Sequence, residues 1–169
     1  APTIIYEMDY LNFIASVEKN IENFGHIFEI EDKSKQAIAD LNQTLSTEKA
    51  KLEGQDLNAL IVMYNDGKFS AYGKGSRFGI VHDYFGSHGN SISSEFIQAH
   101  NPDLLYVLDR NAAISNEAIH KESIENNLIK ETSAYKNGKI TYLSPDVWYL
   151  SGGGLEALEI MAKEVGNSL

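Results

Sequence analysis

The chain contains no cysteine among its 169 residues. Disulfide frameworks, thiolate metal sites and cysteine nucleophiles are therefore all excluded. No apolar run approaches the roughly 18 residues of a membrane-spanning helix. Positive charge is also scarce, because 14 Lys and Arg oppose 24 Asp and Glu and give a formal net charge of −10. This balance argues against a nucleic-acid-binding protein and against docking on anionic lipid, since both need clustered basic residues.

The first residues carry little targeting information. Ala1, Pro2 and Thr3 provide neither an initiator methionine nor the basic start and apolar stretch of a signal peptide. They indicate a processed chain, an excised piece or the surviving part of a longer protein. Ile4 and Ile5, which follow, are typical of the end of a buried strand.

Two helices are expected in the first third of the chain. Apolar residues recur at three- and four-residue steps over 10–24, which is typical of one buried helix face. Asp9 can cap the start of this helix, and Gly25 can end it. A second helix is expected over 32–53, where roughly 22 residues would span about 33 Å. Its sparse apolar positions suit a strut between two bodies, although an ordinary amphipathic helix fits the pattern equally well.

The rest of the chain alternates between strands and helices. Strands are expected at 59–64, 68–72, 104–108 and 139–143, and the apolar runs of all but the second predict buried strands. Helices are expected near 78–85, 91–99, 126–130 and 155–165. The turn Asn65-Asp66-Gly67 predicts that the first two strands form a hairpin. The alternation predicts an α/β fold with a mainly parallel sheet flanked by helices.

Arginine is rare in this chain, and both copies follow predicted strands. In α/β sheets, ligands bind outside the carboxyl ends of the strands, on the connecting loops. Arg77 and Arg110 lie on such loops, and the planar guanidinium group grips oxyanions in a bidentate fashion. The pattern indicates an anionic ligand with hard oxygen atoms. The alternative is that each arginine pairs with a nearby acid such as Asp83 or Asp109, and spacing alone does not decide.

Two further loop residues are candidates for binding. His88 lies in a Gly/Ser loop before a helix, and Tyr149 follows Trp148 beside three glycines. A lone loop histidine is usually solvated, and most loop tyrosines pack on their ring and hydrogen-bond through the hydroxyl. The remaining histidines have no partner at metal-ligand spacing and are interpreted as surface or packing residues: His26, His82, His100 and His120.

Common catalytic and nucleotide-binding motifs are absent. The stretch 73–79 differs by one residue from the dinucleotide fingerprint and follows a hairpin instead of the first strand of a crossover unit. There is no phosphate-binding loop and no Gly-x-Ser-x-Gly elbow. The glycines at 152–154 could present amides to an anion, and a tight backbone crossing explains them equally well.

Five phrases of the sequence together resemble class III substrate-binding proteins of iron–siderophore ABC transporters, of the catecholate (enterochelin-type) group. They are found at 73–83, 88–93, 107–110, 134–140 and 148–154. Several long matches in the right order are more specific than any single motif. The resemblance implies that the chain is only part of such a protein, with most of the N-terminal lobe missing. Its parts would be the end of the N-terminal lobe at 1–30, a long interlobe helix at 31–56 and the C-terminal α/β lobe at 57–169.

The resemblance also implies a function. Members of this group are not enzymes. They bind a ferric catecholate siderophore between two lobes and deliver it to an ABC transporter permease for iron uptake, from the periplasm or as extracytoplasmic lipoproteins. No intrinsic cofactor is implied, because the Fe(III)–siderophore is the cargo. Arg77 and Arg110 match arginines that grip the catecholate oxygens. His88 and Tyr149 match residues that complete the iron shell around linear tetradentate siderophores. The connection between Gly86 and His88 is shorter here than in the family.

Coordination chemistry agrees with this set of residues. Fe(III) is hard and favours six ligands that are largely oxygen, so a four-oxygen siderophore leaves two positions open. Tyrosinate and imidazole can fill them. A haem or corrinoid carrier of the same fold class is the main alternative, since haem carriers can also use a tyrosine. A metal-assisted hydrolase using His88 with Asp83 or Asp109 is disfavoured, because no base or nucleophile constellation accompanies them.

Overall fold

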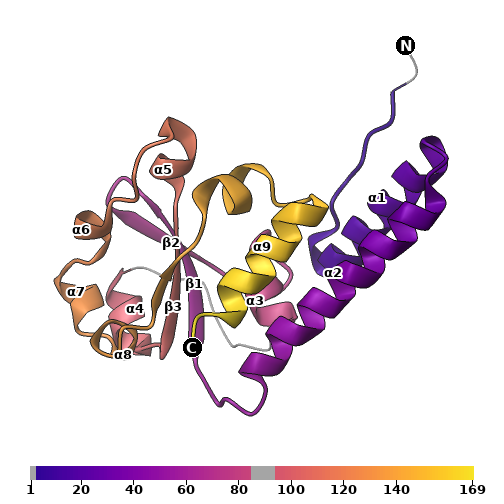
Figure 1. Ribbon diagram of the computed structural model, residues 1–169. Helices are drawn as coiled ribbons and strands as arrows, with labels where there is room; N and C mark the ends of the chain where they lie inside the picture. Colours follow the sequence, from indigo (N-terminus) through magenta and orange to yellow (C-terminus); the bar gives the residue numbers. More distant parts are fainter. Residues whose placement is uncertain (1–2, 85–93) are drawn as a thin grey trace.

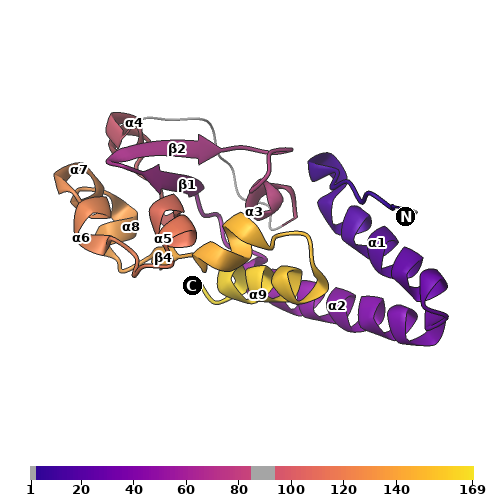
Figure 2. The same cartoon turned by 90° about the horizontal axis from the view of Figure 1, so that it is seen from above.

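The computed structural model describes residues 3–84 and 94–169. Figure 1 shows an α/β body with two long antiparallel helices along one side. The view from above in Figure 2 places these two helices side by side, with the C-terminal helix between the second of them and the sheet.

The described part of the chain contains one sheet, with the strand order β2-β1-β3-β4. The strands are β1 (Ala59–Asn65), β2 (Lys68–Tyr72), β3 (Leu104–Asp109) and β4 (Ile140–Tyr142). β1 pairs with β2 in the predicted antiparallel hairpin, whereas β3 runs parallel to both β1 and β4. The expectation of a mainly parallel α/β sheet is therefore confirmed. The edge strand β4 is only half-buried, however, and not fully buried as its apolar run suggested.

Helices cover both faces of the sheet. The larger ones are α1 (Phe13–Ile27), α2 (Glu31–Leu52), α4 (Ser94–His100) and α9 (Leu155–Gly166). The shorter ones are α3 (Ile80–Asp83), α5 (Arg110–Ser115), α6 (Lys121–Ile124), α7 (Asn127–Lys130) and α8 (Ser133–Lys136). There are also a 3₁₀ turn, η1 (Tyr10–Asn12), and a π-helical turn, η2 (Asp146–Leu150). Successive strand residues point to opposite faces of the sheet, so each face carries its own apolar core.

The long helix α2 packs against α9 and α1 through its thin apolar stripe. Leu41 and Leu45 are fully buried, and they belong to the same core as Leu158 and Val165 of α9. The helices touch closely at Gly166, where an added Cβ would lie 2.8 Å from the Cβ of Glu48. The predicted long helix is thus confirmed and is attached to the α/β body along its C-terminal half.

The structure corrects three expectations near the N-terminus. Ile4 and Ile5 form no strand and are 61% and 81% exposed, since no edge of the described sheet lies beside them to supply hydrogen-bond partners. Asp9 caps η1 by accepting from the backbone N–H of Leu11 at 2.9 Å, ahead of α1 itself. Gly25 lies within α1 instead of ending it, because it allows close contact with Ser34 of α2.

Candidate functional site

The side chain of Tyr149 is the meeting point of both arginines. Arg110 donates from Nε to the Tyr149 hydroxyl at 2.9 Å, and Arg77 donates from Nη2 to the Tyr149 backbone oxygen. The guanidinium carbons of Arg77 and Arg110 lie 5.0 and 5.7 Å from the centre of the Tyr149 ring, within range for cation–π attraction. Three of the four predicted site residues, from distant segments of the chain, are therefore in direct contact.

Tyr149 is held by the turn that precedes α9. It lies in η2 next to Trp148, which is 1% exposed and belongs to the core. The Trp148 indole donates from Nε1 to Glu164 of α9 at 2.6 Å, and the Ser144 backbone N–H donates to the same carboxylate at 3.2 Å. The segment before the turn and the middle of the turn are thus both fixed to one residue of α9. π-Helical turns are frequent at functional sites, and here the turn leaves the Tyr149 ring half-buried beside the arginines.

Arg110 is the first residue of α5 and follows directly on β3. Its Nη1 donates to the side-chain oxygen of Asn65, at the end of β1, at 3.0 Å. Asn65 was missed by sequence reasoning, because it was interpreted only as a turn residue. Its position at the carboxyl end of a parallel strand was the signal that could have identified it.

The salt-bridge alternative for the arginines is wrong within the described part of the chain, where neither Arg77 nor Arg110 forms an ion pair. Asp83 accepts from the backbone N–H of Gly75 at 2.8 Å. Asp109 pairs with His120 instead. Both guanidinium groups therefore keep a positive charge that no described carboxylate neutralises at close range.

His88 lies outside the described residues, so its predicted role stays a prediction. Among the residues that are described, no group of three or more His, Asp or Glu side chains is placed to hold a metal ion.

Tyr72, at the end of β2, is a second phenol beside the cluster. Partial burial raises the pKa of Tyr72, and the charges of Arg77 and Arg110 oppose the shift. Its ring packs edge-on against Phe78 with centroids 4.7 Å apart. Tyr72 is consequently protonated at neutral pH, and its hydroxyl donates to the sulfur of Met63 at 3.7 Å. Sequence reasoning missed Tyr72, although its place directly before the glycines of the stretch 73–79 was a usable signal.

A hollow of about 210 Å³ adjoins Arg77 on the side of α1. Met8, Trp148, Leu150, Gly152 and Gly153 contribute to its wall. An added Cβ at Gly153 would lie 3.2 Å from the sulfur of Met8, so this glycine permits a close approach of two segments. The observation favours the packing explanation of the glycine run over an anion site.

The other histidines correspond only partly to the interpretation as surface or packing residues. His82 is fully buried and its Nε2 hydrogen-bonds with the backbone oxygen of Tyr72 at 3.0 Å, which is a packing role. His120 is different, because its Nδ1 lies 2.8 Å from Oδ2 of the fully buried Asp109. Sequence spacing had not linked these two residues.

The chain belongs to the periplasmic binding protein family, whose model matches residues 1–147. The petrobactin-binding protein YclQ of Bacillus subtilis is 41% identical over 180 residues, which cover 100% of this chain and 57% of YclQ. The crystal structure of YclQ superposes with a TM-score of 0.91 at 40% identity, covering 99% of this chain and 63% of that one. The chain therefore spans under two thirds of the length of this relative.

Two other solved structures extend the comparison. The siderophore-binding protein BauB, solved with a complex between two molecules of acinetobactin and ferric iron, gives a TM-score of 0.90 at 32% identity over 99% of this chain and 64% of BauB. The catecholate-siderophore-binding protein VctP of Vibrio cholerae gives 0.88 at 31% identity over 98% of this chain and 64% of VctP. All three relatives are named as binding proteins, for petrobactin, for a siderophore solved as acinetobactin with ferric iron, and for catecholate siderophores. Within the described residues of this chain, no helix has the length and apolar character needed to cross a bilayer.

Proposed function

We propose that this chain is the C-terminal lobe and interlobe helix of a two-lobe protein that binds a ferric catecholate siderophore and delivers it to an ABC transporter permease. The observation that carries the proposal is the contact of Tyr149 with both Arg77 and Arg110. The relatives support the siderophore class, and VctP supports the catecholate type.

The chemistry of the cluster suits an anionic ferric chelate. Guanidinium groups form short, charge-assisted hydrogen bonds with catecholate oxygens. The Tyr149 hydroxyl accepts a hydrogen bond from Arg110, which fixes the position of a phenolic oxygen, a hard ligand of the kind that suits Fe(III). Tyr149 and His88 would fill the two positions that a four-oxygen siderophore leaves open.

The domain boundaries belong to the same proposal. Residues 1–30 would complete an N-terminal lobe, 31–56 would form the interlobe helix and 57–169 the C-terminal lobe. The surface of 1–30 supports this division, because its large apolar side chains are exposed. They include Ile5 at 81%, Leu11 at 76% and Phe28 at 63% exposure. An N-terminal lobe placed on this surface would bury them and would add the second wall of the cleft.

Location and partners follow from this role. The protein would act outside the cytoplasmic membrane, either free in the periplasm or anchored by a lipid, and its partner would be the transporter permease. Nucleic acid is not a partner under this proposal, since the net charge of −10 opposes it.

A competition experiment with the intact two-lobe protein tests the proposal. Ferric bis-catecholate should bind in the micromolar range or tighter, and iron-free catechol should compete poorly because it lacks the metal that Tyr149 would ligate. Haem is the discriminating competitor, because a haem carrier of this fold could also use a tyrosine. Preference for haem over the ferric catecholate would contradict the proposal and favour the alternative cargo.

A further inference from the structure

Asp109 is a fully buried carboxylate with an unusually complete set of partners. Oδ1 accepts from the backbone N–H groups of Asn111 and Ala112 at 3.0 and 3.2 Å. Oδ2 accepts from the backbone N–H of His120 at 2.9 Å and contacts its Nδ1 at 2.8 Å. Burial acts to raise the pKa of Asp109, but the hydrogen bonds from His120 and Ala112 outweigh it and hold the pKa below its usual range. The carboxylate is therefore ionised, as a buried charge with this many donors should be.

These hydrogen bonds fix the backbone at Arg110. Asp109 is the N-cap of α5, and Arg110 is the first residue of that helix. A second tie holds the same turn, because the Asn111 side chain donates to Asp66 in the β1–β2 turn at 2.6 Å. The direction in which Arg110 leaves the sheet is thus set by contacts on both sides of it.

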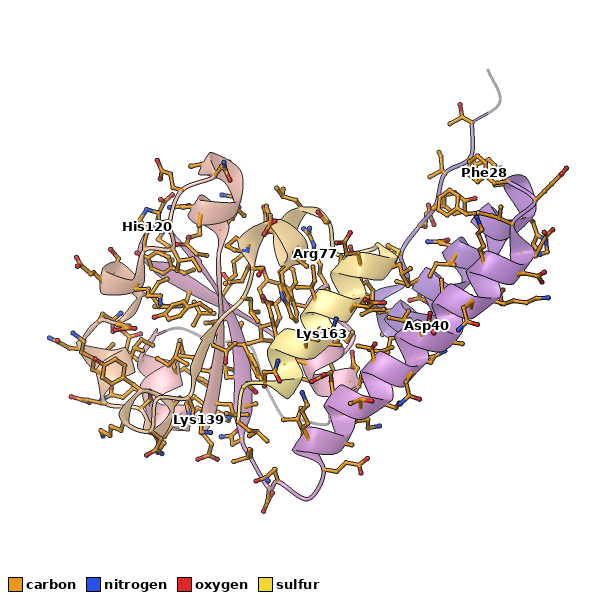
Figure 3. All side chains as sticks on the ribbon, viewed as in Figure 1. Phe28, Asp40, Arg77, His120, Lys139 and Lys163 are labelled. Atoms are coloured by element: carbon orange, nitrogen blue, oxygen red, sulfur yellow. The ribbon has the colours of Figure 1, made fainter. Side chains whose placement is uncertain are left out.

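His120 closes the loop that follows α5. It lies eleven residues beyond Asp109 and is 39% exposed at its side chain, so it reaches the buried carboxylate from the surface. Figure 3 shows His120 and Arg77 toward the same end of the sheet, which is the end that carries α5 and η2. Glu117 approaches the other ring nitrogen of His120 at 3.8 Å.

We propose that Asp109 and His120 are positioning residues that hold Arg110 in line with Tyr149, so that its free N–H groups point at an anionic oxygen of the ligand. The inference rests on the proposed function, because it assigns to Arg110 the role of gripping the siderophore. It adds a supporting pair that neither the strand pattern nor the motif matches had indicated. Hydrogen-bond partners of metal-ligating residues typically change metal affinity by 10-fold or more when they are removed, and we expect an effect at the lower end of that range for partners that position Arg110.

Substitution of His120 tests the proposal in the intact two-lobe protein, with ferric bis-catecholate as the probe. His120→Ala keeps the backbone N–H bond to Asp109 but loses the Nδ1 contact, and we expect roughly tenfold weaker binding. His120→Asn can donate an amide N–H from the position of Nδ1, and it should restore affinity to within about twofold of wild type. An alanine variant with unchanged affinity, or an asparagine variant as weak as alanine, would overturn the proposal.

Two controls separate positioning from a general loss of stability. Tyr106→Phe breaks the buried hydrogen bond to Ser168, at 2.7 Å, away from the cluster. It should lower the melting temperature without changing affinity. The NMR signal of the Arg110 Nε–H, assigned by its loss in Arg110→Lys, should shift in His120→Ala and return in His120→Asn without any ligand. An unmoved signal in both would contradict the proposal even if the alanine variant bound poorly.

A double-mutant comparison distinguishes failure of this inference from failure of the proposed function. If His120 acts through Arg110, His120→Ala should cost little further affinity in an Arg110→Lys background. Full additivity would overturn the positioning role while leaving the function intact. If Arg110→Lys itself leaves affinity unchanged, Arg110 does not grip the ligand, and both the function as proposed and this inference fall.

Discussion

At the scale of single residues, the decisive feature is that two guanidinium groups meet one phenol. Arg110 donates one hydrogen bond from Nε to Tyr149 and another from Nη1 to Asn65. Lysine carries the charge but offers a single nitrogen, so it cannot make both bonds and still reach a ligand.

Arg110→Lys should therefore weaken binding of ferric bis-catecholate by about 1–3 kcal/mol, the usual range for a hydrogen bond that involves a charged group. Isothermal titration of the two-lobe protein measures this difference. Lys74→Arg, on an exposed loop position, is a matched control that should leave the affinity close to wild type. An unaltered affinity of Arg110→Lys would show that Arg110 has only a structural role.

Asp109 gives a prediction about pH. The folded state holds the pKa of this carboxyl below its usual range, and the unfolded value is about 3.9. Its stabilising contribution is therefore complete above the unfolded value and is lost as the pH falls through the lower folded pKa. The free energy of unfolding, measured by urea titration between pH 6 and pH 3, should decline on acidification. In Asp109→Asn the decline should be shallower, and an identical slope would be evidence against an ionised Asp109 in the folded state.

At the scale of elements, the strands and long helices could be predicted because their patterns repeat several times. β1, β3 and α2 each carry a long enough apolar pattern to be located within one or two residues. The one-turn helices α5, α6 and α8 were missed, because four to six residues are too few for a helical period to be visible. Their ends are set by capping side chains and by the neighbouring elements.

Individual residues of the candidate site could be predicted from the sequence, but the contacts between them could not. Arg77, Arg110 and Tyr149 were identified from rare residue type, loop position and family phrases. Asn65, Tyr72 and the Asp109–His120 pair were missed. Their importance depends on tertiary contacts between segments 11 to 77 residues apart, as in the bond from Arg110 to Asn65.

The attachment of α2 to the α/β body can be tested at Leu41. This side chain is fully buried in the core shared by α2 and α9. Leu41→Ala should lower the free energy of unfolding by about 2–5 kcal/mol, because it removes buried methyl groups and leaves a cavity. Gln43→Ala on the exposed side of the same helix should change it by less than about 0.5 kcal/mol. Equal effects of the two substitutions would contradict the packing described for α2.

At the scale of the whole molecule, the proposed function makes the chain one wall of a binding site between two lobes. The cluster of Arg77, Arg110 and Tyr149 includes the exposed side chain of Arg77 and two half-buried ones. On an open surface, water and salt screen the charges of the two arginines, so the cluster by itself binds small anions weakly.

Under the proposed function, the 169-residue chain alone should accordingly bind ferric bis-catecholate at least tenfold more weakly than the two-lobe protein, since it would lack one wall of the cleft. Parallel titrations of the two proteins by tryptophan fluorescence measure the difference, because Trp148 adjoins Tyr149. Tight binding by the chain alone would mean either that a second copy supplies the missing wall or that the site does not lie between lobes. Sedimentation velocity with and without the ligand separates these two explanations.

The most direct test of the whole account is the visible spectrum of ferric bis-catecholate bound to the two-lobe protein. Ligation of the iron by Tyr149 should shift the charge-transfer band relative to the free complex. Tyr149→Phe should reverse most of that shift and weaken binding. Tyr142→Phe is the matched control, because this tyrosine bonds Glu125 on the other face of the sheet at 2.7 Å, and it should leave the band unchanged. A band that is identical in wild type and Tyr149→Phe would contradict the assignment of Tyr149 as an iron ligand.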